Sequence, residues 1–191
     1  LRDVRAFRDH ELSDELEQLL HQKSVTGRSS WSRLFDETMA DMRIDLDGEQ
    51  LTLSDTLNRL SSTDGAVRKA AAKALGQHLS GQVRLFSLIT NTLSKDKEIE
   101  DRWRSYAAPM SSRNLENQVG DDVVEALVSA VKDAYRRLSH RYYARKAKWF
   151  GVDQLDYWDR NAPLPDQADR TYSWEDARST VLDAYGGFDP Q

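Results

Sequence analysis

The chain has 191 residues, long enough for one domain with a hydrophobic core and too long to depend on disulfides or a metal for stability. It contains no cysteine, which excludes disulfides, thiol catalysis and cysteine-ligated zinc, and its four histidines are never paired at the i, i+4 spacing of a helical metal site. The formal net charge of −5 disfavours nucleic acids and acidic membranes as partners, and no apolar run approaches the ~18 residues of a membrane span.

The N-terminal part of the chain predicts two helices followed by a β-hairpin. Apolar residues recur at helical spacing over residues 13–23 and again over residues 30–42. In "IDLDGEQLTLS" they alternate with polar residues around Asp47-Gly48, which is a strong signal for a tight hairpin turn.

The middle of the chain predicts helices separated by turns. Ser54 and Asp55 are expected to cap a short helix that ends near Leu60. A longer helix is expected over residues 65–93, and the small residues on one of its faces indicate close packing. A charged stretch follows, and Pro109 interrupts it.

The C-terminal part predicts the longest periodic helix, over residues 121–150. Its apolar stripe is expected to be buried and consists of Val124, Leu127, Val128, Val131, Tyr135, Leu138, Tyr142 and Trp149. The segment "GVDQLDYWDRNAPLP" favours an edge or isolated strand, because a short apolar and aromatic run ends there at two prolines. A last helix is expected from a cap at Ser173 to a stop at Gly186.

Together these patterns predict a mainly α fold, a multi-helix array with one small β-hairpin and one short extra strand. Residues 1–191 are expected to form a single helical region, with a sub-boundary near residues 109–120. The chain starts at Leu1 rather than Met and has no charged tail after "GGF", which suggests a piece of a longer protein. Any targeting signal would then lie outside it.

The segment "HELSD" is one residue short of the zinc-peptidase pattern H-E-x-x-H, because Asp14 stands where the second histidine would be. A carboxylate can bind zinc, but the surrounding residues are typical of a helix start. Ser13 is a candidate N-cap, and acidic residues occupy the first turn. We therefore interpret the segment as a capped helix rather than a metal site.

Two charged segments have structural explanations as well as functional ones. In "KDKEIEDRWRSY", helical ion pairs of Glu98 with Arg102 and of Glu100 with Arg104 account for the pattern, whereas a general acid or base would need a carboxylate in an apolar pocket. In "RRLSHRYYARKAKW", cations alternate with aromatic residues as in single-strand nucleic-acid binders. The aromatic residues fall on the predicted apolar stripe, so we interpret the cations as the solvated face of a helix.

The third segment of interest is "LDYWDRNAPLP". Tyr157, Trp158 and Asp159 cluster on or just after the predicted strand, whose unpaired edge could hold an extended peptide by strand addition. The alternative is a packed aromatic strand with a polar exit turn.

The order of several segments resembles a known family. "WSRLFDETMADMRI" is followed by "LDGEQLTLSDTLNRLSSTDGAVRKAAAKAL", "NTLSKDKEIEDRWRSY", "LSHRYYARKAKWFGVDQLDYWDRNAPLP" and "YSWEDARSTVLDAYGGFDP". In content and order, this series resembles the region upstream of the active site in oligoendopeptidase F-like enzymes of the thimet oligopeptidase superfamily. None of these strings is itself a catalytic fingerprint.

The resemblance implies a largely helical, cytoplasmic zinc metallopeptidase that cuts short peptides inside a deep channel. The family's H-E-x-x-H helix lies downstream of a segment like "VLDAYGGF", so the resemblance places no catalytic residue and no metal ligand in this chain. Zinc is expected in the parent protein and not in this fragment, which would be inactive alone. The fragment would form channel wall and lid and pack against the remainder of the peptidase, with no nucleic-acid or membrane partner.

The resemblance also places Leu155 to Asp159 near a strand that borders the family's cleft. Tyr157, Trp158 and Asp159 are accordingly the candidate peptide-contacting residues. The alternative function is a stand-alone helical module that binds peptides or proteins without catalysis, and nucleic-acid binding through residues 136–148 is a third hypothesis.

Overall fold

The computed structural model describes residues 5–165 and 171–189, so Leu1 lies outside the described residues. Helices dominate, and the prediction of a mainly α fold is confirmed. The elements are η1 (Arg8–His10), α2 (Asp14–Ser24), α3 (Arg28–Asp41), β1 (Arg43–Leu46), β2 (Glu49–Thr52), α4 (Leu53–Arg59), α5 (Gly65–Trp103), α6 (Ser111–Glu116), α7 (Asp121–Ala134), η2 (Arg136–His140), α8 (Arg141–Trp149), η3 (Tyr157–Asp159) and α9 (Trp174–Phe188). None of the helices in the described ranges combines the length and the apolar character needed to cross a bilayer.

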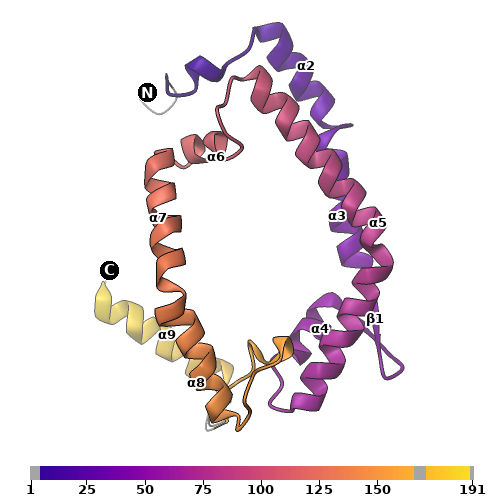
Figure 1. Cartoon of the computed structure of the whole chain (residues 1–191), viewed down its shortest axis with the longest axis vertical. Coiled ribbons are helices and arrows are strands. Elements are labelled where there is room, and N and C mark those ends of the chain that lie inside the picture. The colour runs from indigo at the N-terminus through magenta and orange to yellow at the C-terminus, as the bar shows by residue number, and fades with distance from the viewer. Residues whose placement is uncertain (1–4, 166–170, 190–191) are drawn as a thin grey trace.

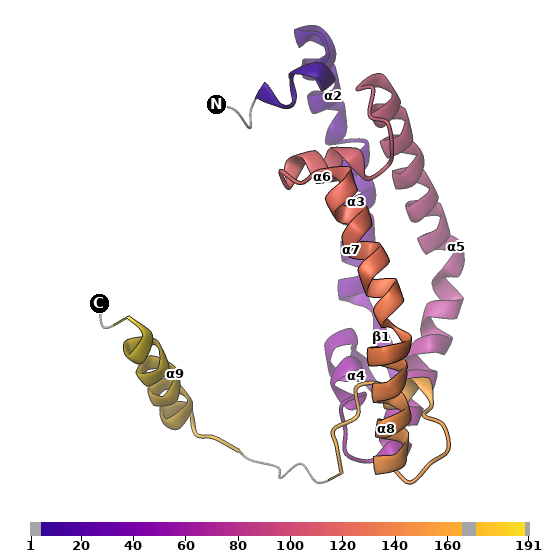
Figure 2. The same cartoon turned by 60° about the vertical axis from the view of Figure 1, so that its left-hand side comes forward.

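The elements are arranged along α5, a helix of 39 residues. Figure 1 shows α2 and α3 beside α5, while α6, α7 and α8 form the opposite side of an elongated ring of ribbon. The ring closes where η3 packs against α5. In Figure 2, α9 stands clear of the other helices. The chain therefore has two long sides joined at both ends of α5.

The predicted hairpin is confirmed. β1 and β2 pair antiparallel, and both residues of the turn, Asp47 and Gly48, have positive φ angles of 55° and 90°. Two consecutive positive φ angles define the turn that matches strand twist, which explains the Asp-Gly pair. The Asp45 carboxylate accepts a hydrogen bond from the Gly48 amide at 3.1 Å.

The best-buried part of the chain lies between this hairpin and the first half of α5. Ile44 and Leu51 face each other across the hairpin and are both buried. Strand β1 contacts α5, where Ala71 and Ala72 are also buried and their small side chains allow close approach. This packing fixes the base of α5, which carries the candidate site.

The predicted helix cap at Ser173 is confirmed, Asp64 is a further cap, and the cap of α4 differs from the prediction. Asp64 accepts a hydrogen bond from the Ala66 amide at 2.8 Å, and Ser173 accepts one from the Asp176 amide at 3.1 Å. The short helix α4 is capped by Thr52 rather than by Ser54 and Asp55. The helix starts earlier because the Thr52 hydroxyl bonds both the amide and the carboxylate of Asp55.

The extra strand predicted in "GVDQLDYWDRNAPLP" is wrong. The segment instead bends and forms the single turn η3. An isolated strand would leave its backbone groups without a ladder partner, whereas here the amides of Asp159 and Ala162 donate to the carbonyls of Asp156 and Asp159 at 3.0 and 3.1 Å.

The helix predicted over residues 121–150 is present but not uniform. Its middle part, η2, is π-helical, with the His140 amide donating to the Tyr135 carbonyl at 2.9 Å. The last helix also passes the predicted stop at Gly186 and ends at Phe188. Glycine is a common helix terminator but can continue a helix at a cost of about 1 kcal/mol.

The prediction that the stripe on residues 124–149 is buried is wrong for this chain. Leu127 and Leu138 are 63% and 61% exposed, and Trp149 is 48% exposed. The amphipathic pattern is correct, but no other described element packs over this face. α9 carries further exposed apolar residues, among them Trp174 and Phe188. An exposed apolar face of this extent is typical of an interaction surface.

Candidate functional site

The candidate site is built around a buried ion pair between α5 and η3. Arg68 lies one turn into α5, and its side chain is only 4% exposed. Its Nε and Nη2 atoms donate to Oδ1 of Asp159 at 3.1 and 2.7 Å, and its Nη1 atom donates to the carbonyls of Ser62 and Thr63. All three nitrogen atoms of the guanidinium are therefore hydrogen-bonded, and the side chain fixes η3 against α5.

A second buried cation supports the same segment from α8. Lys146 donates from Nζ to the backbone carbonyl of Arg160 at 2.8 Å. The cations of Arg68 and Lys146 each lie 5.7 Å from the centre of the Phe150 ring. Burial, followed by the nearby charge of Arg68, lowers the pKa of Lys146. Two cations are thus held at the junction of α5, α8 and η3.

The three predicted site residues share one turn, but their surroundings differ. Tyr157 is 69% exposed, and its ring meets that of Trp158 edge to face at 4.8 Å. Trp158 is half-buried, with Nζ of Lys69 5.3 Å from the centre of its ring. Asp159 points to Arg68 instead of standing free. The turn presents two aromatic groups and uses its carboxylate to hold them in place.

Arg68 and Lys146 were missed by the sequence reasoning. A signal did exist for Arg68, because it precedes Ala71 and Ala72 on the face of α5 that small residues mark as buried. A cation at such a position requires a partner. Lys146 belongs to the cations that the sequence pattern placed on a solvated helix face, and that interpretation is wrong for this residue, which is only 2% exposed.

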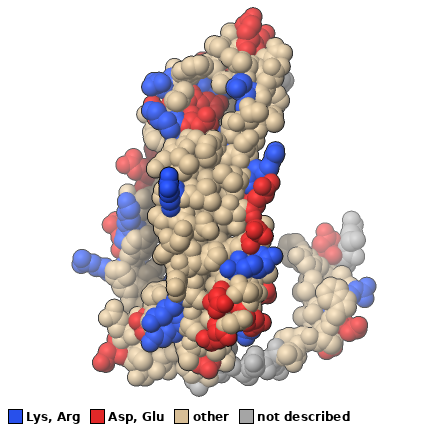
Figure 3. Space-filling view, turned by 90° about the vertical axis from the view of Figure 1, so that its right-hand side faces the viewer, with Lys and Arg blue, Asp and Glu red and all other residues tan. Residues whose placement is uncertain are grey.

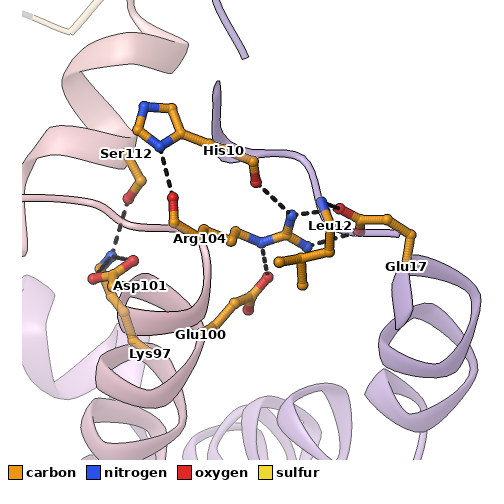
Figure 4. A network of polar contacts seen from close by, with 8 residues as sticks. All are labelled: His10, Leu12, Glu17, Lys97, Glu100, Asp101, Arg104 and Ser112. Carbon is orange, nitrogen blue, oxygen red and sulfur yellow. Dashed lines mark hydrogen bonds and ion pairs between the residues drawn. The ribbon is translucent and has the colours of Figure 1, made fainter. Parts of the chain in front are cut away.

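The segment "HELSD" lies at the other end of α5 and forms a structural contact. Figure 4 shows the His10 ring against the end of α5, where Nδ1 is 2.7 Å from the carbonyl oxygen of Arg104. The ring also stacks on Tyr106 at 3.9 Å. Ser13 is the N-cap residue of α2, but its side chain makes no cap hydrogen bond. Among the described residues, no group of three or more histidine, aspartate or glutamate side chains could hold a metal ion.

Arg104 is the centre of this second group of contacts. It binds both carboxylate oxygens of Glu17 at 2.6 and 2.8 Å, and its Nε atom donates to Glu100 at 2.8 Å. Glu17 also accepts from the Leu12 amide at 3.1 Å (Figure 4). The hydrogen bond from Arg104, and then that from Leu12, lower the pKa of Glu17 to about 2. These contacts hold α2 on the end of α5.

This depressed pKa predicts an acid-dependent loss of stability. The Glu17 carboxylate contributes its full stabilisation above pH 4.5, and the contribution disappears as pH falls toward 2. Because the side chain is 38% exposed, solvent screening limits the contribution to about 1 kcal/mol. Urea unfolding of wild type and Glu17→Gln should therefore differ at pH 7 and converge near pH 2. The control is Glu125→Gln, at an exposed site on α7, which should have the same stability as wild type at each pH. A stability difference between wild type and Glu17→Gln that does not change with pH would contradict the assignment.

The predicted ion pairs of the charged stretch are confirmed. Glu98 pairs with Arg102 at 3.3 Å and Glu100 pairs with Arg104 at 2.8 Å. The hydrogen bond from Lys95 lowers the pKa of Glu98, which is the opposite of what a general acid needs. Figure 3, which faces the α3–α5 side, shows charges of both signs around an uncharged band and no basic patch. This part of α5 therefore has a structural role.

Comparison with known proteins places these features in a family context. The family model Peptidase_M3_N, described as oligopeptidase F, matches residues 1–44. Oligopeptidase PepF of Bacillus subtilis is 26% identical over 192 residues, which cover 95% of this chain and 28% of that protein. The oligoendopeptidase F homolog of Lactococcus lactis is 28% identical over 66% of this chain and 21% of that protein.

Solved structures agree with these matches. Oligoendopeptidase F from Enterococcus faecium superposes on 97% of this chain and 36% of its own, with a TM-score of 0.77 and 25% identity. The chain is oligoendopeptidase F-like. A structure from Chlamydophila abortus shares the fold, with a TM-score of 0.79 at 16% identity over 97% of this chain and 32% of that one. The oligoendopeptidase F-like chain spans less than a third of the length of the curated relatives it matches.

Proposed function

We propose that this chain is the helical, non-catalytic portion of a zinc-dependent oligoendopeptidase that hydrolyses short peptides. The observation that carries the proposal is the match to oligoendopeptidase F from Enterococcus faecium, which extends over 97% of this chain in structure at 25% sequence identity. The names of the sequence relatives, oligopeptidase and oligoendopeptidase, support the same substrate class.

The described residues do not fit a catalytic zinc ion. They contain no cluster of three metal-binding side chains, and the printed sequence has no H-E-x-x-H pattern. The zinc ligands and the general base would then belong to another part of a longer, cytoplasmic peptidase. No catalytic step is assigned to a residue of this chain.

In this proposal the chain supplies channel wall and lid. The elongated ring in Figure 1 and the exposed stripe on α7 and α8 support it, because that stripe offers a large apolar face to the remainder of the protein. Tyr157 and Trp158 would contact the peptide. Asp159 would act as a positioning residue, since Arg68 already engages its carboxylate.

A stand-alone interaction module is the second candidate, and the same exposed stripe favours it. The two functions differ in chemistry, so a hydrolysis assay separates them.

The test uses a quenched fluorescent peptide with the product of the complete reading frame and, separately, with the 191-residue chain. The complete product should cleave the peptide, lose this activity with a zinc chelator and regain it with zinc, while the chain alone should be inactive. Absence of hydrolysis by a folded complete product would favour the interaction module and overturn the proposed function.

A further inference from the structure

A cavity of about 420 Å³ lies between α5, the end of α4 and η3. Four of its lining residues follow the i, i+3, i+4, i+7 pattern of one face of α5, and a leucine at the end of α4 completes this wall: Ala72, Leu75, Gly76, Leu79 and Leu60. Tyr157 and Trp158 from η3 form the opposite wall. The cavity is therefore lined mainly by apolar and aromatic groups.

Gly76 leaves room for a ligand on the α5 side. A Cβ atom built at this position would meet nothing within 4 Å. Glycine in a helix interior costs about 1 kcal/mol relative to alanine, so Gly76 lowers the stability of α5. The cavity therefore has open space beside Gly76.

The polar groups at the cavity are cationic or neutral. Arg160 and Asn161 contribute to the lining, and no acidic residue does. Among the described residues, the guanidinium of Arg160 has no ion-pair partner. Lys69 lies one turn before Ala72 on the same face of α5, with Nζ 5.3 Å from the centre of the Trp158 ring. An apolar ligand that carries a carboxylate matches this combination.

The walls of the cavity are held in place before any ligand binds. Asp159 is fixed by Arg68, and the Arg160 carbonyl is fixed by Lys146 at 2.8 Å. These contacts lie directly beside the two aromatic residues and Arg160. A preformed site loses little conformational entropy on binding.

We propose that this cavity binds the carboxyl-terminal residue of a short peptide. The apolar side chain of that residue would lie against Gly76, and its terminal carboxylate would contact Arg160 and Lys69. This rests on the proposed function, because it assigns one end of the peptide to a defined place in the chain. A free apolar carboxylic acid offers the same chemistry, and the experiment separates the two.

Isothermal titration calorimetry on the 191-residue chain would use an N-acetylated tripeptide ending in phenylalanine. The free acid should bind at least 10-fold more tightly than its carboxamide and than a tripeptide ending in glycine, because a charge-assisted contact and an apolar side chain are each lost. Equal binding of acid and amide would overturn the proposal. N-acetylphenylalanine should bind more weakly than the tripeptide; equal affinity would show a general site for apolar acids and contradict peptide recognition.

Gly76→Leu should fill the cavity and reduce binding of the free acid at least 10-fold, with an unfolding midpoint equal to or above that of wild type. The matched control is Gly81→Leu, at another α5 glycine where a Cβ meets nothing within 4 Å, and its binding should be unchanged. Arg160→Gln should reduce the affinity for the free-acid peptide but not for its carboxamide. Unchanged binding by Gly76→Leu would overturn the proposal.

The same variants distinguish this proposal from the proposed function. If the complete reading-frame product hydrolyses peptides but Gly76→Leu leaves the KM for free-acid and amidated substrates unchanged, the cavity assignment alone is wrong. If the chain binds the free acid as described but the complete product shows no hydrolysis, the peptidase assignment alone is wrong.

Discussion

Asp159→Ala is expected to lower the free energy of unfolding by about 3–5 kcal/mol, because it leaves the guanidinium of Arg68 buried without a counter-charge. The side chains of Arg68 and Asp159 are 4% and 15% exposed, and two hydrogen bonds join them. Urea unfolding followed by circular dichroism measures the loss. Asp153→Ala, an exposed site in the preceding bend, should change stability by less than about 0.5 kcal/mol.

A double variant separates the ion pair from packing. Arg68→Met combined with Asp159→Leu removes both charges, and much of the stability lost in Asp159→Ala should return. A loss below about 1 kcal/mol for Asp159→Ala would show that the pair is not what fixes η3 on α5.

Leu127→Lys and Leu138→Lys are expected to act differently in the 191-residue chain and in the complete reading-frame product. In the chain these side chains are 63% and 61% exposed, so stability should change by no more than about 0.5 kcal/mol. In the complete product, where we propose that the remainder of the protein covers this stripe, each substitution should cost about 2–5 kcal/mol.

Thermal unfolding of both proteins provides the measurement, and Ser129→Lys, on the other side of α7, is the charge-matched control. Equal, small effects in the two proteins would mean that the stripe stays exposed and that the remainder of the peptidase does not pack there.

Local signals in the sequence predicted much of the fold. The Asp47-Gly48 turn, the cap at Ser173 and the ion pairs of the charged stretch each depend on residues close in sequence, and all are confirmed. The fold class follows from the same periodicity.

The features that sequence reasoning missed depend on contacts between distant segments. Arg68 and Asp159 are 91 residues apart, so the pattern around Asp159 could not reveal the partner that draws it into a turn instead of a strand. The burial of the stripe on α7 and α8 was predicted wrongly for a related reason. Amphipathicity identifies the apolar face of a helix, but it does not show whether the element that covers this face belongs to the same chain.

The peptide-contacting role of Tyr157, Trp158 and Asp159 stays a prediction. The aromatic pair of Tyr157 and Trp158 does border a cavity, as a peptide-contacting role would require. The opposite wall comes from α5, including Gly76, and no local pattern near residue 157 indicates it.

The central claim is that this oligoendopeptidase F-like chain is the non-catalytic part of a zinc peptidase, and zinc stoichiometry tests it most directly. Mass spectrometry under non-denaturing conditions should find one zinc ion per complete reading-frame product and none on the 191-residue chain. Stoichiometric zinc on the 191-residue chain would contradict the account, and the histidines and carboxylates of the chain, beginning with His10, would have to be assigned again.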